Sequence, residues 1–185
     1  MKVQIGIIGG EEKNLDNNIK EFLLKIAEEV GEEVAKKGAI LITGGCTGIA
    51  EAASKGALKL GGITLGTPGR KRGTSVKSTM IEICTPIEIG DYVFAGIPSC
   101  DSIIIFPGGP GTLGELAFAI RNKKPLIAIK GISETLINNV FKNCNIDYPF
   151  YLANNAQEAA EIAYKIGKDV LKNEIRIKES KQRRF

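Results

Sequence analysis

Residues 102–115 read SIIIFPGGPGTLGE, and this stretch decides the fold of the chain. The apolar run predicts a buried strand over Ser102–Phe106, and the pattern after the glycines predicts a helix over Gly111–Arg121. Glycines at such a junction let the backbone approach a ligand, and the helix N-terminus presents free N–H groups and the positive end of its dipole. Four glycines and a threonine within seven residues favour an anion site over a plain tight turn. The residues expected to hold a phosphate are Gly108, Gly109, Gly111 and Thr112.

The rest of the chain alternates apolar runs with helical patterns. Short apolar runs predict strands at Val3–Ile8, Ala39–Thr43, Gly62–Gly66, Met80–Cys84, Ser102–Phe106 and Pro125–Ile129. Helical patterns predict helices at Asn14–Lys37, Gly48–Leu60, Glu88–Ile97, Gly111–Arg121, Ser133–Lys142 and Ala156–Lys172. Apolar strands separated by helices indicate a three-layer α/β fold, a Rossmann-like parallel sheet with helices on both faces. We expect a single nucleotide-binding domain over residues 1–175 and a basic, flexible tail over residues 176–185.

A second glycine-rich junction reads TGGCTG over Thr43–Gly48, between the second predicted strand and the second predicted helix. The carboxyl ends of parallel strands lie at one edge of a sheet, so both junctions open on the same edge. One junction would then hold a phosphate and the other a sugar or a base. The nucleotide-binding residues expected in the second junction are Gly44, Gly45, Thr47 and Gly48.

The composition limits both the chemistry and the cellular location. Hydrophobic residues make up 43% of the 185 residues and charged residues 25%, as in an ordinary globular protein. No apolar run reaches the roughly 20 residues of a membrane span, and the chain starts directly with a strand-like segment, so we expect a cytoplasmic protein. Histidine is absent, which removes imidazole-based catalysis, and the cysteines are too widely spaced for a zinc motif. We therefore expect no metal and no cofactor, with the thiols mostly buried; these are Cys46, Cys84, Cys100 and Cys144.

Two better-known phosphate motifs fit the first junction poorly. Gly109–Gly114 matches G-x-G-x-x-G, but a dinucleotide fingerprint needs an acidic residue at the end of the next strand, where Lys130 stands. The same glycines have the Walker A spacing, but Glu115 replaces the lysine and would repel the β- and γ-phosphates. These departures disfavour NAD or FAD binding and ATP hydrolysis.

Further residues extend the glycine pattern along the chain. They are Gly44-Gly-Cys-Thr-Gly48, Gly56-Ala57, Gly61-Gly62, Gly66-Thr-Pro68 and Pro107-Gly-Gly-x-Gly-Thr-x-x-Glu115. This pattern resembles the Lonely Guy (LOG) superfamily, Rossmann-like proteins that are often mislabelled lysine decarboxylases. Within it, the chain is most similar to the branch grouped by name with the DNA-processing Smf-type proteins. The resemblance runs from Val3 to about Ile129.

Enzymatic LOG members are phosphoribohydrolases, which split a nucleoside 5′-monophosphate into free base and ribose 5-phosphate. The resemblance implies that the first glycine junction holds the 5′-phosphate and that Glu115 lies near the ribose, where a carboxylate stabilises an oxocarbenium-like cation. A first-turn glutamate favoured by the helix dipole is the other explanation of Glu115. Active members carry an arginine about fifteen residues before the P-G-G, where this chain has Tyr92. We therefore expect nucleotide binding, with hydrolysis slow or absent.

Basic residues cluster at Arg70-Lys71-Arg72 and in the tail Lys178–Arg184, and the net charge is +4. The first cluster follows the third predicted strand at the edge of the glycine junctions, so it is either a lid over the ligand or plain solvated surface. A nucleic-acid interaction module is disfavoured because the tail has a single aromatic residue, Phe185. We expect a purine nucleoside monophosphate as ligand and no membrane. The family resemblance implies further copies of the chain in a homodimer or larger homo-oligomer.

Overall fold

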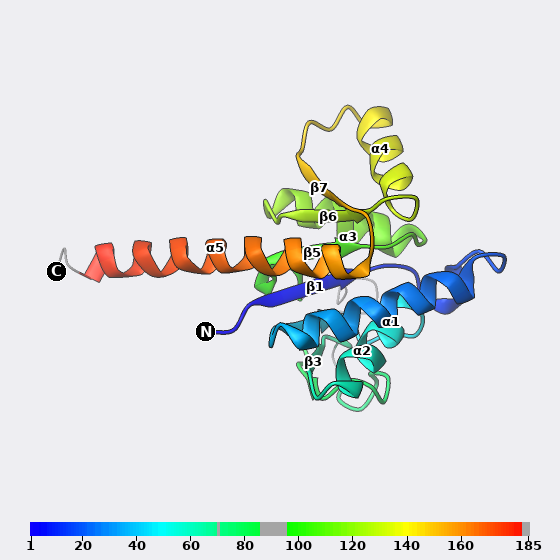
Figure 1. The fold of residues 1–185 in the computed structure, drawn as a ribbon, viewed down its shortest axis with the longest axis horizontal. Helices are drawn as coiled ribbons and strands as arrows, with labels where there is room; N and C mark the ends of the chain where they lie inside the picture. The colour runs from blue at the N-terminus through cyan, green and yellow to red at the C-terminus, as the bar shows by residue number, and fades with distance from the viewer. Residues whose placement is uncertain (70, 86–95, 183–185) are drawn as a thin grey trace.

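Seven parallel strands form one sheet in the order β4-β3-β2-β1-β5-β6-β7 (Figure 1). The computed structural model describes residues 1–69, 71–85 and 96–182, with side chains described up to residue 173. The strands are β1 (Gln4–Ile8), β2 (Ile40–Thr43), β3 (Ile63–Gly66), β4 (Ile81–Glu82), β5 (Ser102–Ile105), β6 (Leu126–Ile129) and β7 (Phe150–Ala153). The all-parallel sheet confirms the predicted fold class.

In the described part of the chain, five α-helices cover the two faces of this sheet (Figure 1). They are α1 (Lys20–Lys36), α2 (Ile49–Lys59), α3 (Pro110–Arg121), α4 (Glu134–Asn143) and α5 (Ala156–Gln182). Within the described residues, short 3-10 helices η1 (Glu12–Asn14) and η3 (Ile97–Ser99) lie in the connections. None of the helices in the described part of the chain is long and apolar enough to span a membrane.

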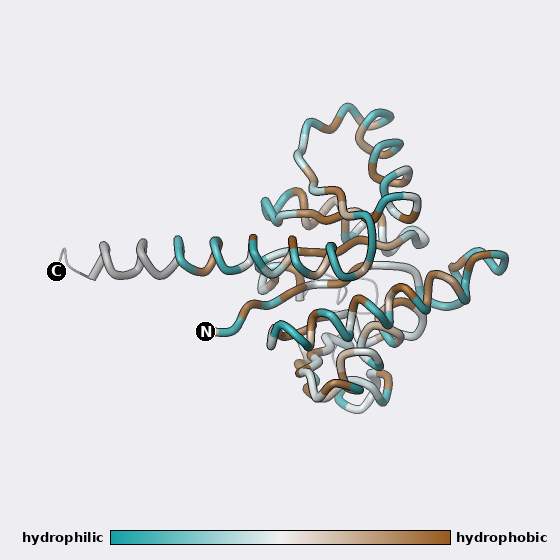
Figure 2. Tube along the Cα trace, viewed as in Figure 1, coloured by the Kyte–Doolittle hydropathy of each residue, from teal (hydrophilic) through white to brown (hydrophobic). Residues whose placement is uncertain are grey.

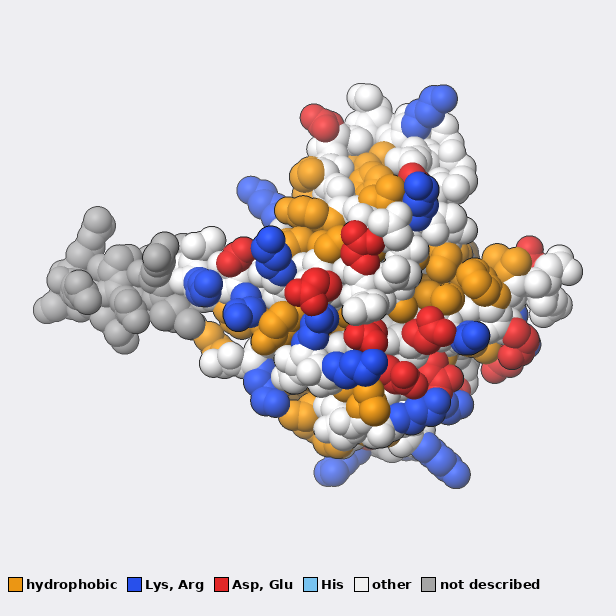
Figure 3. Space-filling view, in the orientation of Figure 1, with side chains coloured by type: hydrophobic (Ala, Val, Ile, Leu, Met, Phe, Trp, Pro, Cys, Tyr) orange, Lys and Arg blue, Asp and Glu red, His pale blue; other side chains and the backbone are white. Residues whose placement is uncertain are grey.

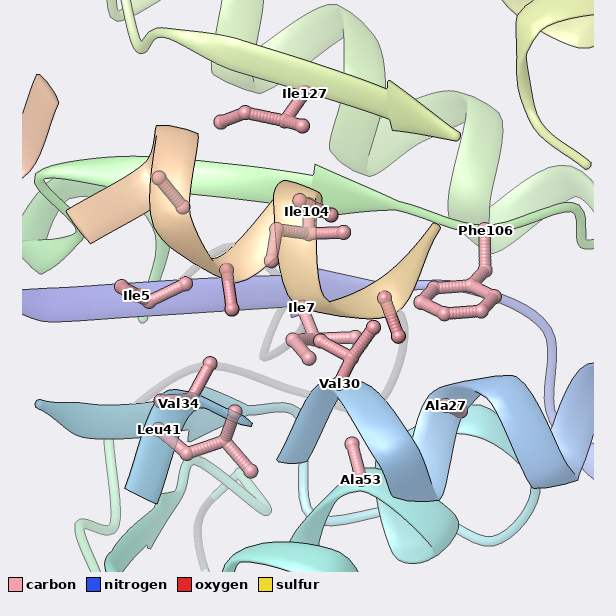
Figure 4. Packing of buried hydrophobic residues seen from close by; sticks show 14 of the residues in the cluster. Ile5, Ile7, Ala27, Val30, Val34, Leu41, Ala53, Ile104, Phe106 and Ile127 are labelled. Carbon is pink, nitrogen blue, oxygen red and sulfur yellow. The ribbon is translucent and has the colours of Figure 1, made fainter. Parts of the chain in front are cut away.

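Alternate strand residues point to opposite faces of the sheet, and each face has its own buried cluster. Ile5, Ile7 and Ile104 pack against α1, α2 and α5 on one face (Figure 4). Ile103 and Ile105 pack against α3 and α4 on the other face. Figure 2 shows that hydrophobic residues gather along the central strands and alternate with hydrophilic residues along the helices.

The strand order places a topological switch point between β1 and β5. From β1 the chain moves outward through β2 and β3 to β4, and it then returns to β5 on the other side of β1. The connections that leave the carboxyl ends of β1 and β5 therefore lead to helices on opposite faces of the sheet. In open α/β sheets a ligand binds in the crevice at such a point.

Several boundaries differ from the sequence prediction. Strand β7 was not predicted, because it is a half-exposed edge strand of four residues between two helices. Helix α5 runs to Gln182 instead of Lys172, since neither glycine nor proline interrupts residues 168–182, and Figure 1 shows it extending beyond the body. Residues 176–182 are thus helical, and the flexibility of the tail stays a prediction.

Two further predictions need correction or lie outside the description. Cys100 is buried and Cys46 half-buried, but Cys84 and Cys144 are exposed, so the expectation of mostly buried thiols is wrong. The helix predicted over Glu88–Ile97 falls largely on residues 86–95, which lie outside the described residues.

Candidate functional site

Three glycine-containing loops meet at the carboxyl ends of β1, β2 and β5. The loop after β1 holds Gly10, whose N–H donates to the carbonyl oxygen of Pro107 at 2.9 Å. The carbonyl oxygen of Gly10 accepts a hydrogen bond from the N–H of Ile49 at 3.1 Å. The first loop is therefore clamped between the two glycine junctions predicted from the sequence.

Some of the glycines predicted to bind the ligand are needed for a close approach of the backbone or for a positive φ. A Cβ added at Gly108 would lie 2.5 Å from the nitrogen of Gly10, and one at Gly48 would lie 2.5 Å from the oxygen of Gly10. Gly48 also has φ of +80° and Gly45 has φ of +76°, which other residues rarely adopt. The structure therefore gives Gly108, Gly45 and Gly48 a packing role at the edge of the site.

The remaining predicted residues line one pocket at the switch point, with a cavity volume of about 60 Å³. Those from the sequence prediction are Gly44, Thr47, Gly109, Gly111, Thr112 and Glu115. Sequence reasoning missed the others, which are Ile7, Gly9, Glu11, Asn14, Cys46 and Ala50. The Gly9-Gly10 pair directly after the first strand was the signal available for them, since the first strand–helix turn is where this fold class binds phosphates.

Two helix N-termini open on this pocket without a side-chain cap. Helix α3 begins with Pro110 after Gly109, and helix α2 begins after Gly48. A Cβ added at Gly111 would meet no atom within 4 Å, so the first turn of α3 faces open space there. The first N–H of α2 is taken by the carbonyl oxygen of Gly10, so the open N–H groups at the pocket are those in the first turn of α3. The positive dipole ends of both helices also favour an anion there.

Glu115 is the buried ionisable group of the pocket, with 7% of its surface exposed. Burial, and to a smaller extent the charge of Glu11, raise the pKa of its carboxyl to about 8. Glu11 itself pairs with Lys13 at 2.8 Å. Among the described residues no lysine or arginine lines the pocket. With Glu115 neutral at pH 7, the charges at the pocket are the Glu11–Lys13 ion pair and the positive ends of the helix dipoles.

A second, water-sized cavity of about 10 Å³ lies behind Glu115. It shares Ile7, Gly44 and Glu115 with the pocket and continues to Thr67 and Cys100. Tyr92, which stands where active LOG enzymes have arginine, falls on residues 86–95 and lies outside the described residues.

The predicted basic lid over the ligand has no contact with the pocket among the described residues. Lys71 and Arg72 do not line the pocket, and Arg70 lies outside the described residues. In the part of the chain that the structure describes, no three His, Cys, Asp or Glu side chains cluster as metal ligands would.

Solved structures with this fold include two that are named for a ligand. The molybdenum cofactor binding protein of Rippkaea orientalis is 30% identical, with a TM-score of 0.75 over 90% of this chain and 98% of that one. The Moco carrier protein of Chlamydomonas reinhardtii is 26% identical, with a TM-score of 0.72 and the same coverage. The DNA processing protein A of Streptococcus pneumoniae, at 15% identity and a TM-score of 0.53 over 85% of this chain and 60% of that one, shares the fold alone.

Sequence comparison places the chain in a family. An uncharacterized protein of Archaeoglobus fulgidus is 35% identical over 128 residues, which are 69% of this chain and 80% of the relative. The model of the SLOG cluster4 family matches residues 2–160. The LOG resemblance of the glycine pattern is thereby confirmed, and the chain belongs to the SLOG cluster4 family.

Proposed function

We propose that this protein binds a small molecule through a terminal phosphate, at the pocket between β1 and β5. The observation that carries the proposal is the open first turn of α3, at Gly111 and Thr112, facing a pocket whose buried carboxyl is neutral at pH 7. An unpaired helix N-terminus favours an anion, and a neutral Glu115 does not oppose it.

The size of the cavity indicates how the ligand enters. Drug-sized ligands occupy pockets of roughly 300–1,000 Å³, whereas this cavity measures about 60 Å³. It therefore takes the phosphate group, and the larger part of the ligand lies toward the mouth. Thr47 at the start of α2 is exposed there and can donate or accept one hydrogen bond.

The first candidate ligand is the molybdenum cofactor or a related pterin phosphate. Two similar structures are named for binding or carrying that cofactor, which is a pterin whose side chain ends in a phosphate. The second candidate is a purine nucleoside monophosphate, which also joins a flat nitrogen heterocycle to a phosphate. Both would place the phosphate at the first turn of α3.

Calorimetric titration separates the phosphate proposal from its alternatives. We expect AMP, GMP and a pterin phosphate to bind, and adenosine, guanosine and the dephosphorylated pterin to bind at least about tenfold more weakly, because they lack a charge-assisted bond to backbone N–H groups. Retention of the molybdenum cofactor through gel filtration, read by pterin fluorescence, distinguishes the two candidates. Equal affinity for nucleosides and nucleotides would contradict the proposal.

Affinity for a phosphate ligand is expected to fall as pH rises through about 8. Glu115 is neutral below its raised pKa of about 8 and anionic above it. The phosphate is already a dianion above about pH 6, so the change between pH 7 and 9 belongs to the protein. Repulsion across the pocket should weaken binding roughly tenfold. Titrations of the native protein and of Glu115→Gln at pH 7 and 9 check this, and a variant with the same pH dependence would rule out Glu115.

A phosphoribohydrolase is the second candidate function, and Glu115 is its candidate catalytic residue. A carboxylate can stabilise the cationic sugar only when it is ionised, so any hydrolysis through Glu115 should increase toward pH 8 while binding weakens. We expect little base release from AMP by the native protein and a gain in Tyr92→Arg, measured by chromatography of the free base. Robust release by the native protein that disappears in Glu115→Gln would show that the arginine is dispensable.

A nucleic-acid module has less support. On the face drawn in Figure 3, lysines and arginines are interspersed with glutamates and aspartates. Ion pairs such as Lys55–Glu51 and Lys59–Glu28 also join opposite charges on α1 and α2. Nucleic acid requires a basic stripe that follows the backbone. Affinity that rises with strand length and falls steeply with salt would favour this function instead.

A further inference from the structure

The carboxylate of Glu82 is bound by the backbone of the basic loop that follows β3. The N–H of Gly73 donates to Oε2 of Glu82 at 2.7 Å, and the N–H of Ser75 donates to Oε1 at 2.8 Å. These two bonds, followed by smaller contributions that include the charge of Arg72, lower the pKa of the Glu82 carboxyl. One anion thus receives two backbone hydrogen bonds in a loop rich in positive charge.

The loop over residues 71–75 forms a turn that presents the N–H groups of Gly73 and Ser75 to one anion, and it is called the nest below. Gly73 has φ of +83°, and the hydroxyl of Thr74 donates to the carbonyl oxygen of Lys71 at 2.8 Å, which closes the turn. Backbone N–H groups that point into one concavity bind phosphates in many proteins. A Cβ at Gly73 would meet no atom within 4 Å, so the glycine is needed for its backbone conformation.

The nest lies next to the second glycine loop. The N–H of Val76 donates to the carbonyl oxygen of Gly45 at 2.9 Å. Gly45 follows Gly44, which lines the pocket. The loop of residues 73–75 is therefore fixed next to the loop whose Gly44 lines the pocket.

We propose that the backbone N–H groups of Gly73 and Ser75, with Arg72, form a second oxyanion-binding site beside the pocket, and that the Glu82 carboxylate is its internal occupant in the ligand-free protein. The class of ligand is a phosphate or another tetrahedral oxyanion, which accepts from two N–H groups as a carboxylate does. A tethered carboxylate competes at an effective concentration on the order of millimolar or more. Free phosphate fills the nest only when Glu82 leaves it.

The experiment is a phosphate titration of the full chain, followed through the backbone amide signals of Gly73 and Ser75 by NMR. In Glu82→Ala these signals should shift with inorganic phosphate at concentrations at least about tenfold lower than in the native protein, because the internal competitor is gone. Glu82→Gln keeps one acceptor oxygen and should give an intermediate response. Adding Arg72→Ser to Glu82→Ala should weaken the response about threefold or more.

Glu158→Ala is the matched control. Glu158 also accepts a backbone hydrogen bond, from the N–H of Asn154 at 2.8 Å, and its bonds to Asn154 lower the pKa of its carboxyl. Removing it frees one backbone N–H beside the first turn of α5, so the response at Asn154 should be weaker than that at Gly73 and Ser75, where two N–H groups bind one carboxylate. A phosphate response at Asn154 as large as that at Gly73 would show nonspecific ion binding and overturn the proposal.

The phosphate response of Gly73 and Ser75 is measured independently of phosphate binding in the pocket. The amides of Gly111 and Thr112 report phosphate at the first turn of α3, so the two sites are read separately in one titration. Absence of a response at Gly73 and Ser75 in Glu82→Ala overturns the second site and leaves the pocket untouched. A disordered loop in Glu82→Ala that phosphate restores to order supports the second site, and one that phosphate leaves disordered overturns it.

Discussion

Replacement of Gly111 with valine is expected to abolish binding of a phosphate ligand while leaving the fold intact. A Cβ at this position meets no atom within 4 Å, and the residue lines the cavity of about 60 Å³. The valine methyl groups would occupy the space of the phosphate and cover the N–H groups of the first turn of α3. Loss of two charge-assisted hydrogen bonds corresponds to at least about a hundredfold loss of affinity.

Calorimetry with AMP or a pterin phosphate measures this loss, and thermal unfolding measures the stability of the variant. Valine has no lower helix propensity than glycine, so Tm should not fall. Gly108→Ala is the contrasting variant, because its Cβ would lie 2.5 Å from the nitrogen of Gly10 and should lower Tm. If Gly111→Val retains its affinity, the phosphate site lies elsewhere.

Gly31→Ala is expected to destabilise the protein by about 2–4 kcal/mol. In an exposed helix the same substitution usually stabilises by about 1 kcal/mol, so the sign of the effect is itself informative. Here α1 and α2 cross with their backbones in contact. A Cβ at Gly31 would overlap the carbonyl oxygen of Ala53, and one at Gly56 would overlap the carbonyl oxygen of Glu28. Backbone atoms cannot rotate aside as a side chain does.

Urea denaturation of Gly31→Ala and of Gly167→Ala tests this reading. Gly167 is also a buried helical glycine, but its nearest neighbour is the side chain of Val3, which can move. The control should therefore lose less stability. Equal losses of stability in both variants would show that the α1–α2 backbone contact is no less tolerant of an added Cβ than the side-chain packing around Gly167. Because α2 begins at the pocket, a shift of α2 should also weaken ligand binding.

The sequence was sufficient for the features that depend on local pattern. A run of apolar residues ending in P-G-G-P-G-T specifies a buried strand, a glycine turn and a helix start within one short segment, and β5 and α3 follow it closely. The alternation of such units specifies a parallel sheet. Glu115 and the two glycine junctions could be proposed for the same reason, since the parallel sheet brings their ends to one edge.

Other features depended on contacts that are distant in the sequence. Strand β7 forms because β6 offers an edge to pair with, although its own four residues carry a weak signal. The division of the glycines into those that pack and those that line the pocket depends on how closely the Gly10 loop approaches Gly108 and Gly48.

The electrostatic character of the site was decided by the tertiary structure as well. The sequence shows Glu115 one turn into a helix but does not show that burial raises the pKa of its carboxyl to about 8. It shows the basic cluster at residues 70–72 but not that Glu82 returns to be bound by the backbone beside it. The sequence determined which segments could hold an anion, through turn and helix chemistry that neighbouring residues specify. Only the folded chain decided which N–H groups stay open and which carboxyl loses its charge, because solvent exclusion and pairing arise when distant segments pack together.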